Sequence, residues 1–438
     1  MARVYESEPA VAVGREPRLW RDALGDRAIA FRVPSITDIL LLATSCVSIA
    51  AACWWSVAIA KMWLTRRVLG VCDEGLSMPA SNRSVAVFVP AHNEQAVIGG
   101  LIDSLRAQDH PNCRFILALD RCTDETRAVA YQRVAADGRF VIHEIDACPD
   151  GWAGKVHALH SAVEAHAGDA ELLVFADADT ILHPGCIRAT DAIAAARSLD
   201  MLSLLSTLTY DQPFERRAQA LCVFELVRRY PPLRASRDSD RRPFANGQFM
   251  LWTRSAYERV GGHGAFRTEL LEDIAMARAV WRERLRTHVI PAGAMLSCRM
   301  YPDEQAFQRG WQRIFIESAN RKPRRLDNWA ATAIARGSIV PGLLAVFVGH
   351  AVVTLLLGAQ GWAWFALTAA VVALSLWLAG VWLFLVNASV PRQHRLAVLL
   401  QWPVGSAVTA RFLRAAAAAL RGRRSTVWAG MSYDRPAR

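Results

Sequence analysis

The chain has 438 residues, 53% of them hydrophobic and 21% charged, and its mean hydropathy of +0.15 excludes a wholly soluble protein and predicts a globular domain joined to membrane segments. The net charge of +11 favours an anionic membrane surface as partner, and the lack of zinc-finger, RNA-binding or basic-region patterns argues against nucleic acid. Nine cysteines occur singly with no C-x-x-C pair, which indicates a reduced compartment and no zinc site.

Apolar segments near both ends of the chain predict membrane helices. Residues 1–37 are polar and predict a loosely ordered or interfacial arm. Residues 38–60 predict a transmembrane anchor, because no charge occurs from Ile39 to Ala60 and this length crosses a bilayer of ~30 Å. Residues 337–391 predict two further transmembrane helices, and residues 392–438 an interfacial helix with a basic tail.

The distribution of basic residues predicts the topology of these segments. The turn near residue 360 carries no Lys or Arg, whereas the flanks of the two C-terminal helices do. The positive-inside rule therefore places residues 61–336 and the tail on the cytoplasmic side of the inner membrane, in a multi-pass protein. The Arg residues of the N-terminal arm argue against this orientation, since they would then lie on the outer side.

Residues 61–336 have the pattern of a soluble α/β domain. Short apolar runs predict strands at Val85–Pro90, Phe115–Asp120, Phe140–Ile145 and Leu172–Ala176. Segments with helical periodicity separate these runs, which predicts a mostly parallel sheet covered by helices.

Two carboxylates follow the strand at Leu172–Ala176 directly. Asp177 and Asp179 would stand at the carboxyl end of a strand, where open α/β sheets bind ligands. Two oxygen ligands one residue apart suit Mg²⁺ or Mn²⁺, which in turn suit a diphosphate. The alternative is a strand end at which one Asp caps the next helix.

Six motifs occur in the order seen in family 2 glycosyltransferases. They are Pro90-Ala-His-Asn-Glu94, Asp120-Arg-Cys-Thr-Asp-Glu-Thr126, Gly154-Lys155, Asp177-Ala-Asp179, Leu271-Glu-Asp273 and Gln308-Arg-Gly-Trp-Gln-Arg313. The resemblance covers roughly residues 85–320 and implies the GT-A fold, a Rossmann-like α/β domain. It is greatest to the bacterial branch of ceramide glucosyltransferase-like, hopanoid-associated and carotenoid-acid glycosyltransferases.

The resemblance implies how the nucleotide-sugar donor is bound. It assigns donor contacts to Pro90, Glu94, Asp120, Lys155 and Asp177. It assigns the metal, Mg²⁺ or Mn²⁺, to Asp179 with Asp177. Carboxylates just beyond strand ends can accept hydrogen bonds from a ribose hydroxyl or a uracil N–H, and a lysine at a helix start can place its charge on a diphosphate. Asp124 either supports its turn or simply caps the following helix.

The remaining motifs are assigned to catalysis and to the acceptor. Asp273 is implied as the general base, with Glu272 beside it; the alternative is a charged helix N-terminus. Gln308, Trp311 and Arg313 occupy the region of the family's Gln-x-x-Arg-Trp motif and would contact diphosphate or acceptor, although Trp311 also suits ordinary packing. This motif is imperfect here, which argues against processive polymer synthesis.

The segment from Glu215 to Arg242 is rich in arginine and predicts either a basic rim for anionic head groups or a solvated helix face. Taken together, the sequence predicts a membrane-bound, metal-dependent glycosyltransferase that moves a sugar from a nucleotide-sugar, most simply a UDP-sugar, to a hydroxyl or carboxyl of a lipid. Inversion at the anomeric carbon rests on the resemblance. The alternatives are a processive polysaccharide synthase and a catalytically inactive membrane protein that binds sugar nucleotides.

Overall fold

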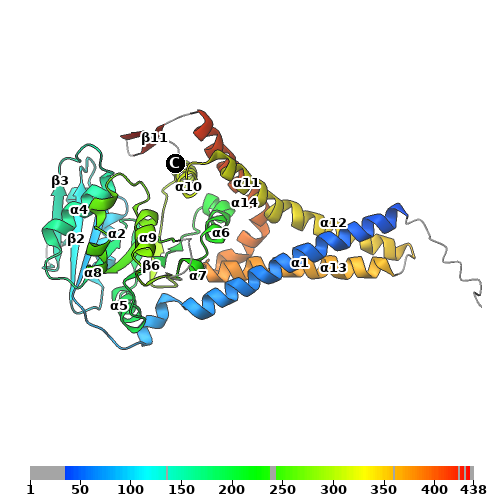
Figure 1. Ribbon diagram of the computed structural model, residues 1–438, viewed down its shortest axis with the longest axis horizontal. Helices are drawn as coiled ribbons and strands as arrows, with labels where there is room; N and C mark the ends of the chain where they lie inside the picture. The colour runs from blue at the N-terminus through cyan, green and yellow to red at the C-terminus, as the bar shows by residue number, and fades with distance from the viewer. Residues whose placement is uncertain are drawn as a thin grey trace, which may run out of the picture.

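The computed structural model describes residues 35–134, 137–236, 243–358 and 361–422, together with the backbone of residues 425–428 and 431–434. An α/β domain is joined to a bundle of long helices that projects from it (Figure 1). Parts of three sequence predictions lie outside the described residues. These are the polar arm over residues 1–34, Arg241 and Arg242 at the end of the arginine-rich segment, and Arg423 and Arg424 of the basic tail.

A seven-stranded sheet forms the centre of the α/β domain, with the strand order β3-β2-β1-β4-β8-β6-β9. Its strands are β1 (Val85–Ala91), β2 (Cys113–Asp120), β3 (Phe140–Ile145), β4 (Leu172–Ala176), β6 (Met201–Leu205), β8 (Phe249–Thr253) and β9 (Thr287–Pro291). Only β8 runs antiparallel to its neighbours, β4 and β6, in this sheet of the described chain. The prediction of a mostly parallel sheet is therefore confirmed.

The sheet is buried on both faces, which explains why its strands read as continuous apolar runs. Side chains alternate along β1, so Val85 and Val87 pack against one layer of helices and Ala86 and Phe88 against the other. The first layer contains α2 (Ile98–Arg106), α3 (Thr126–Val134) and α5 (Cys186–Ala196). The second contains α4 (Gly154–His166), α8 (Arg254–Arg259), η4 (His263–Phe266) and α9 (Glu272–Arg282).

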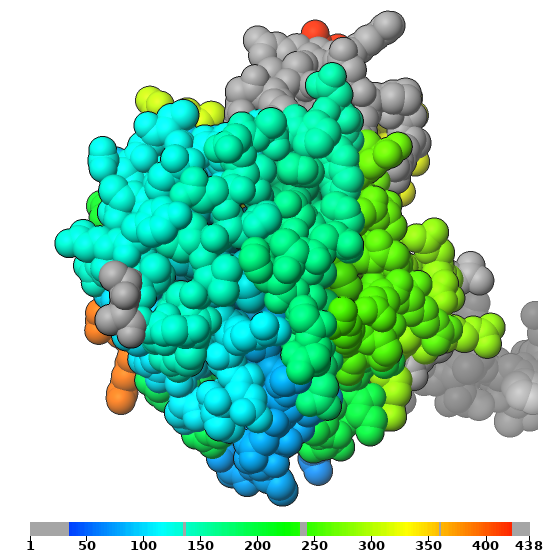
Figure 2. All heavy atoms as spheres, turned by 90° about the vertical axis from the view of Figure 1, so that its left-hand side faces the viewer, coloured from blue at the N-terminus to red at the C-terminus, as the bar shows by residue number. Residues whose placement is uncertain are grey.

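A small second sheet lies at the carboxyl end of the central strands. It has the order β5-β10-β7, with β5 (Thr180–Leu182), β7 (Thr207–Leu208) and β10 (Leu296–Cys298). Figure 2 looks at the end of the α/β domain away from the helical bundle, where segments from the two halves of the domain lie side by side. The remaining short elements are η2 (Cys72–Ser77), η3 (Glu215–Gln219), α6 (Ala220–Arg229), α7 (Pro232–Ala235) and α10 (Glu304–Ser318).

Four helical segments of the described chain are long and apolar enough to cross a membrane: Ile36–Ser77, Pro323–Leu356, Trp362–Asn387 and Arg392–Gly422. They contain α1 (Ile36–Leu69), α11 (Pro323–Ile334), η5 (Ala335–Ile339), α12 (Val340–Leu356), α13 (Trp362–Asn387) and α14 (Arg392–Gly422). The helices α1, α12 and α13 run alongside one another (Figure 1). A glycine allows one of these contacts, because a Cβ at Gly380 of α13 would stand 2.3 Å from the Trp55 ring of α1.

The helices extend past two of the expected domain boundaries. The first helix continues to Leu69, so the boundary expected at residue 61 falls inside it. The boundary expected at residue 337 falls within η5, between α11 and α12. The basic residues Arg66 and Arg67 lie in the last turn of α1, where positive side chains interact favourably with the helix dipole, so the helix continues through them. After α14, the short strands β11 (Ser425–Trp428) and β12 (Met431–Asp434) form an antiparallel pair.

Candidate active site

The two carboxylates predicted at the end of a strand lie in a tight turn between the two sheets. Asp177 directly follows β4 and Asp179 directly precedes β5. The carbonyl of Asp177 accepts hydrogen bonds from the backbone N–H and the hydroxyl of Thr180, at 3.2 and 2.7 Å. The turn holds both acids at the carboxyl end of a central parallel strand, where ligands of open α/β sheets bind.

One ammonium group joins two of the predicted acids. Lys155 Nζ lies 2.7 Å from Asp177 Oδ1 and 2.7 Å from Glu272 Oε1. Burial alone would lower the pKa of Lys155, but the two carboxylates outweigh burial and raise it. Burial would likewise raise the pKa of Glu272, but Lys155 outweighs it and holds that pKa below its usual value. Lys155 and Glu272 thus form a charged pair at the starts of α4 and α9.

Asp179 lies in a different electrostatic environment. Its Oδ1 atom is buried and has no hydrogen-bond partner among the described residues. Burial, followed by the charges of Asp177 and Glu94, raises the pKa of Asp179 to about 7. A carboxylate in this state would be stabilised by a cation placed beside it.

The residues present fit a divalent cation that takes some of its ligands from the substrate. In the described part of the chain, no three His, Cys, Asp or Glu side chains stand close enough to hold a metal ion by themselves. Magnesium is commonly held by only one or two carboxylates, with water and substrate phosphates as its other ligands. Asp179, with its unpartnered oxygen, and Asp177 offer such a pair.

Asp273 is held by two backbone N–H groups. Gly247 donates to its Oδ2 at 3.0 Å, and its own neighbour Ile274 donates to its Oδ1 at 2.7 Å. The loop packs so closely that a Cβ at Gly247 would stand 3.2 Å from Asp273 Oδ2. Burial, followed by the charge of Glu272, raises the pKa of Asp273 to about 7. A carboxyl group with this pKa is suited to accept a proton near neutral pH.

The predicted nucleoside-binding acids have unequal surroundings. Glu94 lies in the loop after β1, and burial together with the charge of Asp177 raises its pKa to about 7. Asp120, at the end of β2, accepts two hydrogen bonds from the Arg121 guanidinium, both at 2.7 Å. A nucleoside contact at Asp120 would therefore require Arg121 to share or release this carboxylate. Pro90 lies within β1 itself.

Asp124 has a clear structural role. Its Oδ1 accepts hydrogen bonds from the backbone N–H of Thr126 at 3.0 Å and from the Thr126 hydroxyl at 2.5 Å. Its Oδ2 accepts from the backbone N–H of Gln95 at 3.2 Å. Asp124 thus caps the start of α3 and ties it to the loop that carries Glu94.

The three predicted residues of α10 diverge in their environments. Trp311 is 2% exposed and packs among Phe307 and Phe315. Arg313 is close enough to the acids to interact electrostatically with Glu272, Asp177 and Asp273, and burial lowers its pKa. Gln308 lies one turn before Trp311 on the same helix.

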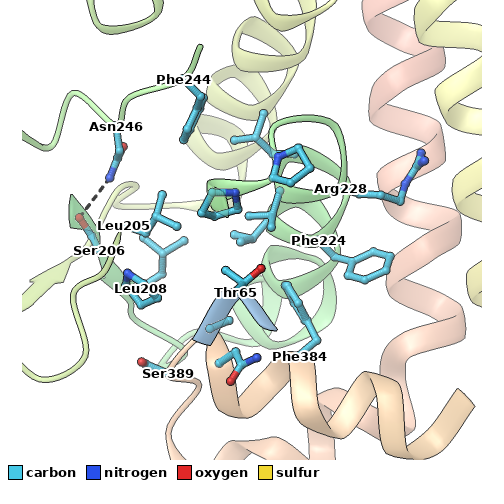
Figure 3. Close-up of a pocket in the computed structure, with 18 of the residues that line it drawn as sticks. Thr65, Leu205, Ser206, Leu208, Phe224, Arg228, Phe244, Asn246, Phe384 and Ser389 are labelled. Carbon is cyan, nitrogen blue, oxygen red and sulfur yellow. Dashed lines mark hydrogen bonds between the residues drawn. The ribbon is translucent and has the colours of Figure 1, made fainter. Parts of the chain in front are cut away.

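A cavity of about 500 Å³ opens beside Asp273. Its wall is made by residues of many parts of the chain, among them Ala58 of α1. Thr65 of α1, Leu205 of β6, Phe224 of α6 and Phe384 of α13 also line it (Figure 3). Trp311 also lines it, so this side chain packs in the core and borders the cavity at once. The helices that project from the domain therefore take part in the site.

The sequence analysis missed two parts of this site. The first is the loop Asn246-Gly247-Gln248, which holds Asp273 and lines the cavity; its signal is a polar run directly before the apolar strand β8. The second is the wall formed by α1, including Lys61 and Arg66. Basic residues at the end of an apolar helix were the signal, but their pattern is the same in any anchor.

Curated relatives resemble part of the chain. A 4,4'-diaponeurosporenoate glycosyltransferase of Staphylococcus aureus strain MRSA252 is 27% identical over 249 residues, which cover 56% of this chain and 64% of the relative. The relative of strain USA300 matches to the same extent. The chain thus spans about 64% of the length of the curated relatives it matches.

Solved structures of glycosyltransferases align over more of the chain at lower identity. A mannosyltransferase of Pyrobaculum calidifontis in complex with GDP-Man and Mn²⁺ has a TM-score of 0.43 and 16% identity, covering 86% of this chain and 99% of its own. A glucosyl-3-phosphoglycerate synthase of Mycobacterium tuberculosis with Mn²⁺ and UDP has a TM-score of 0.36 and 18% identity, covering 57% and 84%.

The family model described as glycosyltransferase-like family 2 matches residues 82–317, which is more than half of the chain. This range contains all the predicted site residues and runs from just before β1 to the end of α10. The motif resemblance is confirmed, as is the GT-A fold that it implied. The chain belongs to the glycosyltransferase-like family 2.

Proposed function

We propose that this enzyme moves a sugar from a nucleotide-diphosphate sugar, most simply a UDP-sugar, to a lipid acceptor held in the 500 Å³ cavity. The observation that carries the proposal is that Asp273 and residues of α1 line the same cavity. Because α1 is long and apolar enough to cross a membrane, a lipid can reach Asp273 from the bilayer along this helix. The name of the Staphylococcus aureus relatives, a diaponeurosporenoate glycosyltransferase, supports a lipid-type acceptor.

The donor would lie against the cluster of charges at the ends of β1 and β4. Glu94 and Asp177 offer acceptors to the nucleoside hydroxyls, with Pro90 and Asp120 shaping the neighbouring strand ends. Lys155 places an ammonium group among carboxylates, where it can also attract a diphosphate. A Mg²⁺ or Mn²⁺ ion held by Asp179 and Asp177 would offset the charge that develops on the departing nucleotide.

Asp273 would act as the general base. Its carboxylate lines the acceptor cavity and is fixed by Gly247 and Ile274, so it can take the proton of an acceptor hydroxyl. The acceptor oxygen then forms a bond to the anomeric carbon while the bond to the diphosphate oxygen breaks. A single displacement of this kind inverts the configuration. Arg313 interacts electrostatically with Asp177 and Glu272, and it would stabilise the leaving diphosphate.

The acceptor would enter between the helices with its apolar part against Phe224, Phe384 and Leu205. Lys61 and Arg66 of α1 add positive charge to the same wall, which suits a site at the surface of an anionic membrane. Trp311 and Gln308 would border the acceptor from α10. The charge distribution of the chain supports a multi-pass inner-membrane protein with this site on the cytoplasmic side.

The test uses the full chain in detergent with Mg²⁺ or Mn²⁺, a panel of radiolabelled UDP-sugars and a total lipid extract, scored for label in the organic phase. We expect label from one donor, and we expect Asp179→Ala to abolish it. Soluble oligosaccharides are offered in parallel. Transfer to these but to no lipid would overturn the acceptor assignment, and UDP binding without any transfer would support the inactive binding protein instead.

A further inference from the structure

Three arginines gather on the side of α6 that faces the membrane helices. Arg228 and Arg229 end α6, and Arg336 lies in η5 at the start of the run that continues into α12. Arg336 interacts electrostatically with Arg228 and with the buried Glu225. The group borders the acceptor cavity, because Arg228 contributes to the cavity wall, but its side chain points away from the cavity toward the neighbouring helices (Figure 3). Arg229 and Arg336 do not belong to the described cavity wall.

One carboxylate pairs with two of these guanidinium groups. Arg228 Nη2 lies 3.0 Å from Glu225 Oε2 and 3.3 Å from the Thr332 hydroxyl of α11. Arg229 Nη1 pairs with the same carboxylate oxygen. Three positive charges therefore meet one negative charge in this cluster of described residues, and the remaining charge calls for a further anion.

Several N–H groups of the cluster have no acceptor. Among the described residues, Arg228 Nε, Arg229 Nε and Nη2, and Arg336 Nη1 are buried without a hydrogen-bond partner. The Arg229 side chain is only 9% exposed, so water does not readily replace the missing acceptors. Burial, although opposed by Glu225, lowers the pKa of Arg229 to about 10.

Aromatic rings cover the faces of two guanidinium groups without satisfying these donors. The Cζ atom of Arg229 lies 4.1 Å from the ring centre of Trp329, and that of Arg336 lies 5.0 Å from the ring centre of Trp54. A ring stacked on the face of a guanidinium attracts its charge, but the N–H bonds lie in the guanidinium plane and remain available. The stacking fixes the planes and leaves their edges for an oxygen-rich anion.

We propose that Arg228, Arg229 and Arg336 bind the phosphate group of an anionic membrane lipid that is not the acceptor. A phosphate presents several oxygens to forked guanidinium donors, which suits arginine better than lysine. The lipid source is favoured because Trp54 and Arg336 belong to segments that are long and apolar enough to cross a membrane. Trp54 lies near the end of the uncharged run Ile39–Ala60, and Arg336 directly precedes the uncharged run that begins at Gly337. Tryptophan and arginine near the ends of such runs lie at head-group depth. The lipid would hold α6, one wall of the cavity, against α1 and α11.

The test measures lipid binding rather than turnover, and it includes a variant of Arg336, which does not belong to the described cavity wall, so that failure of this site can be told apart from failure of the proposed acceptor site. The full chain is delipidated in detergent, and binding of phosphatidylglycerol and phosphatidylcholine is followed by native mass spectrometry. Each arginine near a membrane surface contributes roughly fivefold to anionic-lipid affinity. We therefore expect Arg228→Gln with Arg336→Gln to weaken phosphatidylglycerol binding about 25-fold. The matched control, Arg133→Gln with Arg259→Gln, removes the same charge from the surface of the α/β domain and should change it less than twofold.

A single-residue variant and a titration with inorganic phosphate complete the test. If the double variant does not purify as a single species, Arg336→Gln alone should still weaken binding about fivefold, and Arg336→Lys should restore part of it. Unchanged phosphatidylglycerol binding in the Gln variants overturns the site. Inorganic phosphate is titrated in parallel, and arginine-dependent binding of phosphate at lower concentrations than the lipid would overturn the membrane assignment in favour of a free anion.

Discussion

The proposed donor side and the proposed acceptor side of this site are built by opposite physical means. On the donor side, Lys155 holds Asp177 and Glu272 at 2.7 Å each, and charges compensate one another over short distances. On the acceptor side, apolar residues such as Phe224 and Phe384 surround a single carboxylate, Asp273. Fixed charges thus suit a charged donor, whereas exclusion of water suits an apolar acceptor. The same exclusion of water raises the pKa of Asp273, the proposed base.

The largest expected effect comes from removing the one carboxylate on the acceptor side. Asp273→Asn keeps the shape of the side chain but cannot accept a proton. We expect kcat to fall by about 10²–10⁴-fold, which is the usual contribution of a general base. Binding of UDP, measured by isothermal titration calorimetry, should stay within about twofold, because the donor-side charges are intact.

Asp169→Asn is the control, since the side chain of Asp169 is fully exposed and far from this role. If Asp273→Asn weakened UDP binding as much as it slowed turnover, Asp273 would belong to the donor side, and the distinction between the two sides would be wrong. Equal turnover of the variant and the wild-type enzyme would show that another group is the base.

A bulky side chain in the cavity wall should affect the acceptor alone. In Ala58→Trp, the indole projects from α1 into space that the acceptor would occupy. We expect kcat/KM for the lipid to fall by about 10–100-fold, the range expected when a packed site is overfilled. Ala60→Trp, at an exposed position of the same helix, is the matched control. If hydrolysis of the donor to water falls in parallel with lipid transfer, the cavity is not specific to the acceptor.

The positions of the carboxylates on the proposed donor side could be predicted from the sequence because their signals are local. Asp177 and Asp179 directly follow an apolar run, and the end of a strand places them at one edge of the sheet whatever the rest of the chain does. The same logic located Glu94 and Asp120 after β1 and β2. The pairing of Asp120 with Arg121 escaped prediction, because it depends on the left-handed backbone of Arg121, at φ 49°.

The acceptor side could not be predicted in the same way. Its wall combines residues of α1, β6, α6 and α13 that lie far apart in the sequence, so no local pattern marks them. The apolar character of Ala58 and Phe384 predicts membrane helices, and that property hides their contribution to the cavity wall. Trp311 presents the same difficulty, because its buried ring both packs in the core and lines the cavity, and the sequence pattern of the two roles is the same.

A smaller effect is expected from removing the central charge of the donor side. Lys155→Met leaves Asp177 and Glu272 without their shared cation, so their mutual repulsion opposes binding of a negatively charged diphosphate. We expect the KM for the nucleotide-sugar to rise about tenfold, in line with loss of one charge-assisted hydrogen bond. Arg259→Gln, which neutralises an exposed cation elsewhere, is the control. Unchanged donor KM would assign Lys155 to stability alone.

The smallest expected effect is on stability and comes again from Asp273. Its pKa is about 7 in the folded protein and about 3.9 in an unfolded chain. The folded state therefore binds this proton more tightly, and its stability falls as pH rises from about 4 to about 7. Asparagine cannot ionise, so the melting temperature of Asp273→Asn relative to wild type should rise by on the order of 2–4 °C between pH 4.5 and pH 8. In Asp169→Asn the difference should not depend on pH. If the difference in melting temperature between Asp273→Asn and the wild type did not change with pH, burial on the acceptor side would not raise the pKa of Asp273. The contrast between the two sides would then lie in shape alone.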